Sequence, residues 1–169
     1  ALRDVTEKQG GTYYAAAVGE VNVVQQMKDR QAVIGGEGNG GIIVPELHYG
    51  RDALAGIALF LTHLARSNKK MSELRAGYPS YFMTKDKVDL DPSLDMEQLL
   101  GKMHDKYKAE DCNTLDGLKI DFEDSWVHLR KSNTEPIIRI YAEAPDEALA
   151  SELVARIKED FQQLSTQNR

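Results

Sequence analysis

Residues 118–142 read LKIDFEDSWVHLRKSNTEPIIRIYA, and this stretch decides the fold. Apolar and polar residues alternate in three short segments of it, which is the period-two pattern of half-buried strands. Glu123-Asp124-Ser125 can turn the chain between the first two strands, and the polar residues 130–136 separate the second strand from the third. Strands joined by such short connections pair antiparallel, so we expect an antiparallel sheet.

Two amphipathic helices are expected on either side of these strands in the sequence. Asp95 is placed to cap the first helix, and Pro145-Asp146 opens the second. The apolar positions expected to face the core are Met96, Leu99, Leu100, Met103 and Tyr107 in the first helix, and Leu149, Leu153, Ile157, Phe161 and Leu164 in the second. With a further strand at residues 81–88, residues 78–169 are predicted to form an α+β domain with two helices.

Residues 1–77 show a different pattern, in which strand and helix signals alternate as they do in an α/β layer. We expect a helix or an extended segment at residues 21–27, and a longer helix capped by Asp52. The expected strands and short apolar runs are residues 12–17, 32–34 and 42–44. The helix after Asp52 is expected to turn one apolar face to the core, formed by Leu54, Ile57, Ala58, Leu61 and Leu64.

The expected boundary between the two regions is Ala76-Gly77-Tyr78-Pro79, because glycine and proline together interrupt regular structure. The chain itself begins in an expected helix, with Leu2 and Val5 on its apolar side and Gly10-Gly11 at its end. A helix that starts at the first residue without a capping side chain suggests a chain cut from a longer protein.

Net charge and cysteine content limit the binding partners and the cellular compartment that are expected for this chain. The formal net charge is −6, which disfavours binding to nucleic acid or to an anionic membrane surface. Cys112 is the single cysteine, so an internal disulfide is excluded and a reducing, cytoplasmic location is expected. No apolar run approaches the roughly 18 residues of a membrane span.

The four histidines have no metal-ligand spacing with one another or with Cys112, and no nucleophile with a matched base is visible. We therefore predict neither a metal site nor a catalytic residue in this chain.

The loop Arg130-Lys131-Ser132-Asn133-Thr134-Glu135-Pro136 contains the donors that a phosphate needs. Arg130 can donate two parallel hydrogen bonds to a phosphate, while Ser132, Asn133 and Thr134 can add neutral ones. The same residue types are common in ordinary hairpin loops, and composition taken alone favours that interpretation.

A second loop, residues 35–41, reads GGEGNGG. It lacks the Gly-Lys-Ser/Thr of a P-loop and the glycine order of a dinucleotide-binding loop. The carboxylate of Glu37 suits the opposite task, which is to accept hydrogen bonds from two vicinal hydroxyls, and Asn39 can add a donor and an acceptor. A strained, flexible turn would explain the glycines equally well.

These two loops, together with Arg139-Ile140-Tyr141-Ala142-Glu143-Ala144 and Val18-Gly19-Glu20, resemble the α-D-phosphohexomutases, a family that includes phosphomannomutase, phosphoglucomutase and phosphoglucosamine mutase. Family members have four domains. The resemblance implies that residues 1–77 are most of the third domain, an α/β domain, and that residues 78–169 are the fourth, an antiparallel sheet with two helices.

The resemblance also implies an activity, in which phosphate moves between C1 and C6 of a hexose through a bisphosphorylated intermediate. It implies that Glu37, Gly38 and Asn39 bind the sugar hydroxyls, and that Arg130, Ser132, Asn133 and Thr134 bind the phosphate that is not transferred. The implied supporting residues are Gly19, Glu20 and Arg139. The phosphoserine and the Mg²⁺ ion of the family lie in the first two domains, so this chain alone is expected to be inactive and its partners are a hexose phosphate and its own N-terminal domains.

One departure from the family pattern concerns the sugar. Many members carry Glu-Met-Ser-Gly-His in the sugar loop, whereas this chain has Asn39 and Gly41 in the serine and histidine positions. The Gly-Glu-Gly-Asn-Gly-Gly form resembles archaeal-type phosphoglucosamine mutases, which favours glucosamine phosphate as the substrate. Phosphomannomutase or phosphoglucomutase activity and a stand-alone, non-catalytic phosphosugar-binding module are the alternatives.

Overall fold

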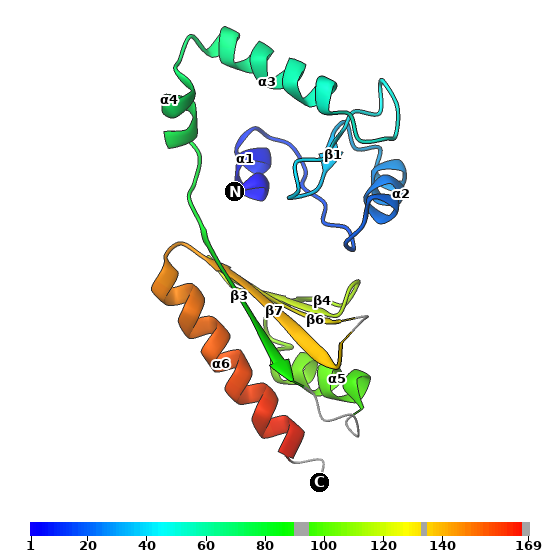
Figure 1. The fold of residues 1–169 in the computed structure, drawn as a ribbon, viewed down its shortest axis with the longest axis vertical. Helices are drawn as coiled ribbons and strands as arrows, with labels where there is room; N and C mark the ends of the chain where they lie inside the picture. The colour runs from blue at the N-terminus through cyan, green and yellow to red at the C-terminus, as the bar shows by residue number, and fades with distance from the viewer. Residues whose placement is uncertain (90–94, 133–134, 167–169) are drawn as a thin grey trace. The chain divides into compact units, whose positions relative to one another are not determined.

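A computed structural model describes residues 1–89, 95–132 and 135–166 (Figure 1). The chain divides into two compact units, Ala1–Pro79 and Ser80–Arg169. Each unit has its own sheet, with two strands in the first unit and five in the second. An α/β unit followed by an antiparallel α+β unit is the predicted fold class, and it is confirmed.

The first unit is built from four helices and one short hairpin. Its elements are α1 (Leu2–Lys8), α2 (Glu20–Arg30), β1 (Gly35–Gly36), β2 (Ile42–Ile43), α3 (Ala53–Ser67) and α4 (Met71–Ala76). The predicted cap of α3 is confirmed, because the Asp52 carboxylate accepts a hydrogen bond from the Ala55 N–H at 2.9 Å. This backbone bond, helped by His48, lowers the pKa of Asp52.

Three sequence predictions for this unit are wrong. Residues 12–17 form no strand, and the strand expected at 32–34 begins only at Gly35. Val33 is 82% exposed, so the apolar run before the glycines is not a buried strand. The apolar face of α3 is also not a core face in this unit, because Leu54 is 78% exposed and Ile57 and Leu61 are exposed as well. Among the described residues of this unit, β1 and β2 pair with each other alone, so no further layer buries these side chains.

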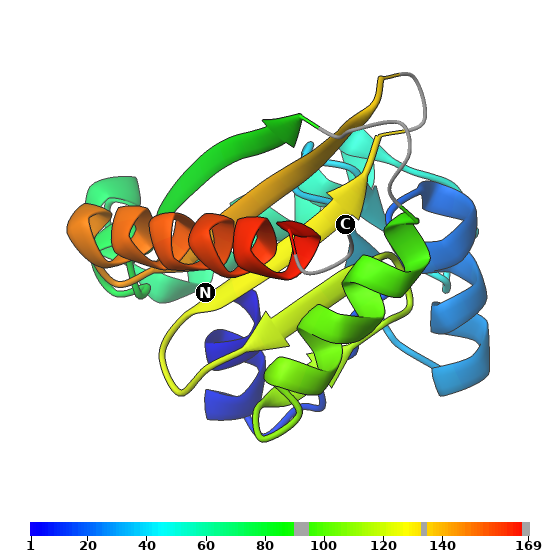
Figure 2. The same cartoon turned by 90° about the horizontal axis from the view of Figure 1, so that it is seen from below.

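The second unit is a five-stranded antiparallel sheet in the order β3-β7-β6-β5-β4. Its elements are β3 (Phe82–Asp89), α5 (Met96–Lys106), β4 (Asp111–Asn113), β5 (Leu118–Asp121), β6 (Trp126–Lys131), β7 (Ile137–Ala144) and α6 (Glu147–Thr166). The alternation over residues 118–142 places Ile120, Val127, Leu129 and Ile140 on one face, where all four are fully buried. Helices α5 and α6 lie side by side over this face (Figure 2).

The helices of this unit follow their predicted patterns closely. The Asp95 carboxylate caps α5 by accepting from the N–H groups of Glu97 and Gln98. Leu153, Ile157 and Phe161 of α6 are buried as expected, but Leu149 is 44% exposed. Leu149 lies in the first turn of α6, where Ala150 instead faces the sheet. Strand β4 was not predicted, because its three residues show no apolar alternation.

Tyr107, at the end of α5, gives this unit a measurable pH dependence. Its hydroxyl donates to Asp160 Oδ2 at 2.5 Å, and burial, followed by this hydrogen bond and then the Asp160 charge, raises its pKa to about 12. A raised phenol pKa means that the associated stability is complete below pH ~10 and is lost as the pH rises towards 12. In urea unfolding at a series of pH values, Tyr107→Phe should therefore lose less stability than the parent chain between pH ~10 and 12. Parallel losses in the two chains would contradict this coupling.

Candidate functional site

The glycine loop of the first unit is a closed hairpin between β1 and β2. Gly36 pairs with Ile42, the Glu37 N–H donates to the Gly41 carbonyl at 3.1 Å, and the Gly40 N–H donates to the Glu37 carbonyl at 3.1 Å. A Cβ at Gly36 would lie 2.3 Å from the Gly41 carbonyl oxygen, so no larger residue fits there. Gly40 has φ +88°, in the left-handed region. The glycines therefore produce a defined loop that presents the Glu37 and Asn39 side chains.

The Glu37 carboxylate is held from two sides. Its Oε1 accepts from the Gly19 N–H at 3.2 Å, and its Oε2 accepts from the Asn39 amide at 3.4 Å. The Asn39 side-chain oxygen in turn accepts from the Gly41 N–H at 2.9 Å. The structure thus brings together Gly19, Glu37 and Asn39, three of the residues singled out from the sequence, while Gly38 lies exposed at the tip. An ionised carboxylate accepts up to about four hydrogen bonds, so Glu37 retains capacity for ligand hydroxyls.

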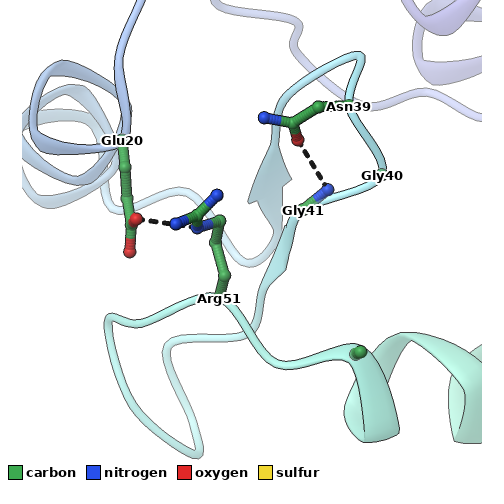
Figure 3. A pocket seen from close by; sticks show the side chains of 6 residues that line it. Glu20, Asn39, Gly40, Gly41 and Arg51 are labelled. Atoms are coloured by element: carbon green, nitrogen blue, oxygen red, sulfur yellow. Dashed lines mark hydrogen bonds and ion pairs between the residues drawn. The ribbon is translucent and has the colours of Figure 1, made fainter.

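An open pocket of about 550 Å³ lies next to this loop, lined by Glu20, Asn39, Gly40, Gly41, Arg51 and Ala53 (Figure 3). Its volume falls within the range of roughly 300–1,000 Å³ that is usual for small-molecule sites. Arg51 Nε contacts Glu20 Oε2 at 2.7 Å across the pocket wall. Glu20 was expected from the sequence, but Arg51 was missed. The signal in the sequence is its position directly before Asp52, the residue that caps α3.

The phosphate-loop residues of the second unit lie at the end of β6. Arg130 is half-buried, and its Nε is 3.0 Å from Asp116 Oδ2 and 3.1 Å from Asp116 Oδ1. Ser132 is 5% exposed, and its N–H donates to the Ile137 carbonyl at 3.0 Å, which joins the ends of β6 and β7. The predicted phosphate ligands Asn133 and Thr134 lie outside the described residues. Asp116 was not predicted, although Asp116-Gly117 is a typical hairpin-turn pair.

Arg139 lies directly opposite Arg130 in the sheet, and Lys87 lies opposite Arg139 on its other side. The three cationic residues therefore form a row on the face of the sheet that α5 and α6 leave uncovered. Like charges in directly opposite positions are destabilising, and the Asp116 carboxylate compensates for the charge of Arg130. An anion bound at this end of the sheet would relieve the remaining repulsion.

Within residues 1–89, 95–132 and 135–166, no group of three or more His, Cys, Asp or Glu side chains is close enough to hold a metal ion. None of the helices in those ranges has the length and apolar character needed to cross a membrane.

Comparison with known families gives two adjoining matches. The description "Phosphoglucomutase/phosphomannomutase, alpha/beta/alpha domain III" matches residues 1–81, and "Phosphoglucomutase/phosphomannomutase, C-terminal domain" matches residues 85–160. The two matches follow each other without overlap and together include both loops described above.

Similar proteins carry mutase names. A phosphoglucosamine/phosphogalactosamine mutase of Sulfurisphaera tokodaii is 42% identical over 143 residues, covering 83% of this chain and 31% of that protein. A phosphoglucomutase/phosphomannomutase of Thermococcus kodakarensis is 37% identical, covering 89% of this chain and 33% of that protein. A probable phosphoglucosamine mutase of Methanopyrus kandleri is 34% identical, covering 90% of this chain and 34% of that protein. The chain thus spans about a third of the length of these relatives.

A solved structure shows the same fold. The crystal structure of a phosphoglucomutase/phosphomannomutase family protein from Burkholderia thailandensis superposes with a TM-score of 0.71 at 27% identity. The superposition covers 96% of this chain and 34% of that protein.

Proposed function

The chain belongs to the phosphoglucomutase/phosphomannomutase family, and from that membership we propose that it is the substrate-binding C-terminal part of a phosphohexomutase. In the proposed reaction a phosphoserine outside this chain donates its phosphoryl group to a hydroxyl of a hexose phosphate. The resulting bisphosphorylated sugar reverses its orientation, and its other phosphoryl group returns to the serine. The product carries its phosphate at the other end of the sugar, and the serine is phosphorylated again.

The observation that carries this proposal is the cationic end of β6 and β7. Arg130 is half-buried and oriented by Asp116, Ser132 is almost fully buried beside it, and Arg139 adds a second guanidinium in register. A guanidinium oriented by a carboxylate is well suited to a phosphate, because its remaining N–H donors are fixed in direction. We assign to this loop, including Asn133 and Thr134, the phosphate that is not being transferred.

The glycine loop has the complementary role in the proposal. Glu37, with Gly38 and Asn39, accepts hydrogen bonds from hydroxyls of the sugar, while Gly19 and Glu20 support the loop from α2. We favour glucosamine phosphate as the substrate, because two of the relatives described above are named for phosphoglucosamine. Glucose and mannose phosphates are the alternatives, in keeping with the name of the Thermococcus kodakarensis relative.

The proposal assigns further parts of the enzyme to other regions of a longer protein. Such regions would cover the apolar side chains that α3 exposes, including Leu54, Ile57 and Leu61. They would also supply the phosphoserine and the ligands of a Mg²⁺ ion, since the described residues of this chain offer no metal cluster.

Binding of D-glucosamine 6-phosphate and of inorganic phosphate to this chain, measured by calorimetry, tests the assignment of the two loops. Arg130→Ala should weaken binding of inorganic phosphate by roughly 10- to 100-fold, because it removes charge-assisted hydrogen bonds. Glu37→Gln should change phosphate affinity much less, and Arg66→Ala, at the far end of α3, should change neither affinity.

Equal phosphate affinity in the Arg130→Ala and Glu37→Gln chains would refute the phosphate assignment. Turnover of a hexose phosphate by this chain alone would refute the proposal that the phosphoryl donor lies elsewhere.

A further inference from the structure

Arg51 has more hydrogen-bonding capacity than its known contact uses. Its Nε contacts Glu20 Oε2 at 2.7 Å, and half of its side chain is exposed at the pocket. A guanidinium carries five N–H donors in a fixed plane, and a single carboxylate cannot accept all of them. Glu20 therefore orients Arg51 while leaving donors for another molecule. Figure 3 shows the guanidinium between Glu20 and the loop that carries Asn39.

The side chain of Arg51 occupies the space next to Gly41. A Cβ built on Gly41 would lie 2.7 Å from Arg51 Cδ and 3.1 Å from Asn39 Oδ1. Contacts below 3.0 Å do not occur for real Cβ atoms, so a side chain at position 41 and Arg51 in its present position exclude each other. Position 41 is also where this sequence has glycine in place of the histidine of the family pattern described under the sequence analysis, so the glycine has a structural consequence beyond the loss of that side chain.

We propose that Arg51 is a substrate-binding residue of this pocket, and that Glu20 is the residue that positions it. The inference rests on the proposed function and adds a second sugar-binding group to Glu37, one that donates hydrogen bonds where Glu37 accepts them. A guanidinium can only donate, so its ligand atom is an oxygen of the sugar phosphate and not the ammonium of an amino sugar. Because the phosphate is assigned to the Arg130 loop, we assign to Arg51 a hydroxyl or the ring oxygen of the hexose. Glu37 accepts and Arg51 donates, which fixes the direction of the hydrogen bonds along the sugar.

The test compares binding of D-glucosamine 6-phosphate and inorganic phosphate to the 169-residue chain by calorimetry. Arg51→Ala should weaken the sugar phosphate about tenfold and leave inorganic phosphate unchanged, because the lost bonds are to the sugar. Glu20→Gln should weaken the sugar phosphate by a smaller factor, since Arg51 remains but is held less firmly. The matched control Arg66→Ala should bind both ligands as the parent chain does, and thermal unfolding should show that every variant is folded.

Gly41→Ala provides an independent variant that leaves Arg51 in the chain. Its added methyl group should displace the Arg51 side chain and weaken the sugar phosphate by a similar factor. In the Arg51→Ala background the same change should have little further effect, because there is no side chain left to displace. Fully additive losses in the double variant would overturn the exclusion between position 41 and Arg51.

The outcomes separate this inference from the proposed function. A parent chain that binds neither ligand would overturn the proposed function and this assignment with it. A parent chain that binds D-glucosamine 6-phosphate, with unchanged affinity in Arg51→Ala, would overturn the Arg51 assignment alone.

Discussion

Replacing Gly117 with alanine should destabilise the second unit by about 3 kcal/mol. Gly117 has φ +77°, which side chains other than glycine adopt at a cost, and its Cβ would lie 2.2 Å from the backbone oxygen of Leu129. The β5–β6 hairpin would have to open to relieve that contact, because the obstructing atom belongs to the backbone. Urea unfolding followed by fluorescence of Trp126, the single tryptophan, reports on this unit directly.

Gly101→Ala is the matched control for this prediction. Gly101 lies inside α5, and nothing lies within 4 Å of a Cβ built on it. Alanine there should stabilise the unit by up to about 1 kcal/mol, since glycine is a poor helix former. A Gly117→Ala chain as stable as the Gly101→Ala chain would contradict the predicted clash. Because Asp116 precedes Gly117 and contacts Arg130, the Gly117 variant should also bind inorganic phosphate more weakly than its control does.

Truncating Phe161 to alanine should cost about 3–5 kcal/mol, the usual range for a buried phenylalanine. Phe161 is 2% exposed and belongs to the core cluster between α6 and the sheet. The loss combines the transfer of the ring to water with the cavity left behind. The same unfolding assay should show an unchanged dependence on urea concentration and a lower midpoint.

Leu149→Ala is the control on the same helix. Its side chain is 44% exposed, so its removal should cost about 1 kcal/mol or less. Equal losses for the two variants would mean that α6 packs on the sheet through a different face from the one described.

Much of the second unit could be predicted, because its elements bury their apolar residues against one another. Alternation over residues 118–142 specified which side chains face α5 and α6, and Asp95 specified where α5 begins. The error at Leu149 arose because helical spacing alone does not show where along its length a helix leaves the sheet. In that turn of α6 the buried residue is Ala150, whose small side chain contributes little to an apolar sequence pattern.

The first unit was predicted less well for a physical reason. Apolar runs such as residues 32–34 show that side chains favour burial, but a strand also needs a neighbour for its backbone hydrogen bonds. In this unit Gly35–Gly36 pairs with Ile42–Ile43, and Val44 forms an isolated bridge with His48, whereas residues 32–34 lie outside the strands. The apolar spacing of α3 correctly predicted a helix, but the prediction that its apolar side chains are buried in this unit was wrong.

The candidate site shows a similar division. The residue types around Glu37 and Arg130 suggested hydroxyl and phosphate binding as hypotheses, and the resemblance to a family favoured these hypotheses over ordinary turns. Their partners Gly19 and Asp116 contact them across hairpins and between elements, and Arg51 reaches Glu20 in the same way. Such contacts depend on register and on helix placement, which composition does not specify. The resemblance to a family indicated Gly19 and Glu20, but neither spacing nor resemblance indicated Arg51 or Asp116.

The position of β3 at the edge of the sheet sets an order of events during synthesis. Strands β4 to β7 pair with their neighbours in sequence, so each hairpin can close soon after it leaves the ribosome. β3 is made first, yet its partner β7 follows only about fifty residues later, as in the pairing of Val88 with Ile138. Until β7 is made, the backbone N–H and C=O groups of β3 lack their sheet partners, and strands in that state can associate with other chains. A nascent chain that stalls before Ile137 would therefore be the aggregation-prone species, and completion of β7 would end that exposure.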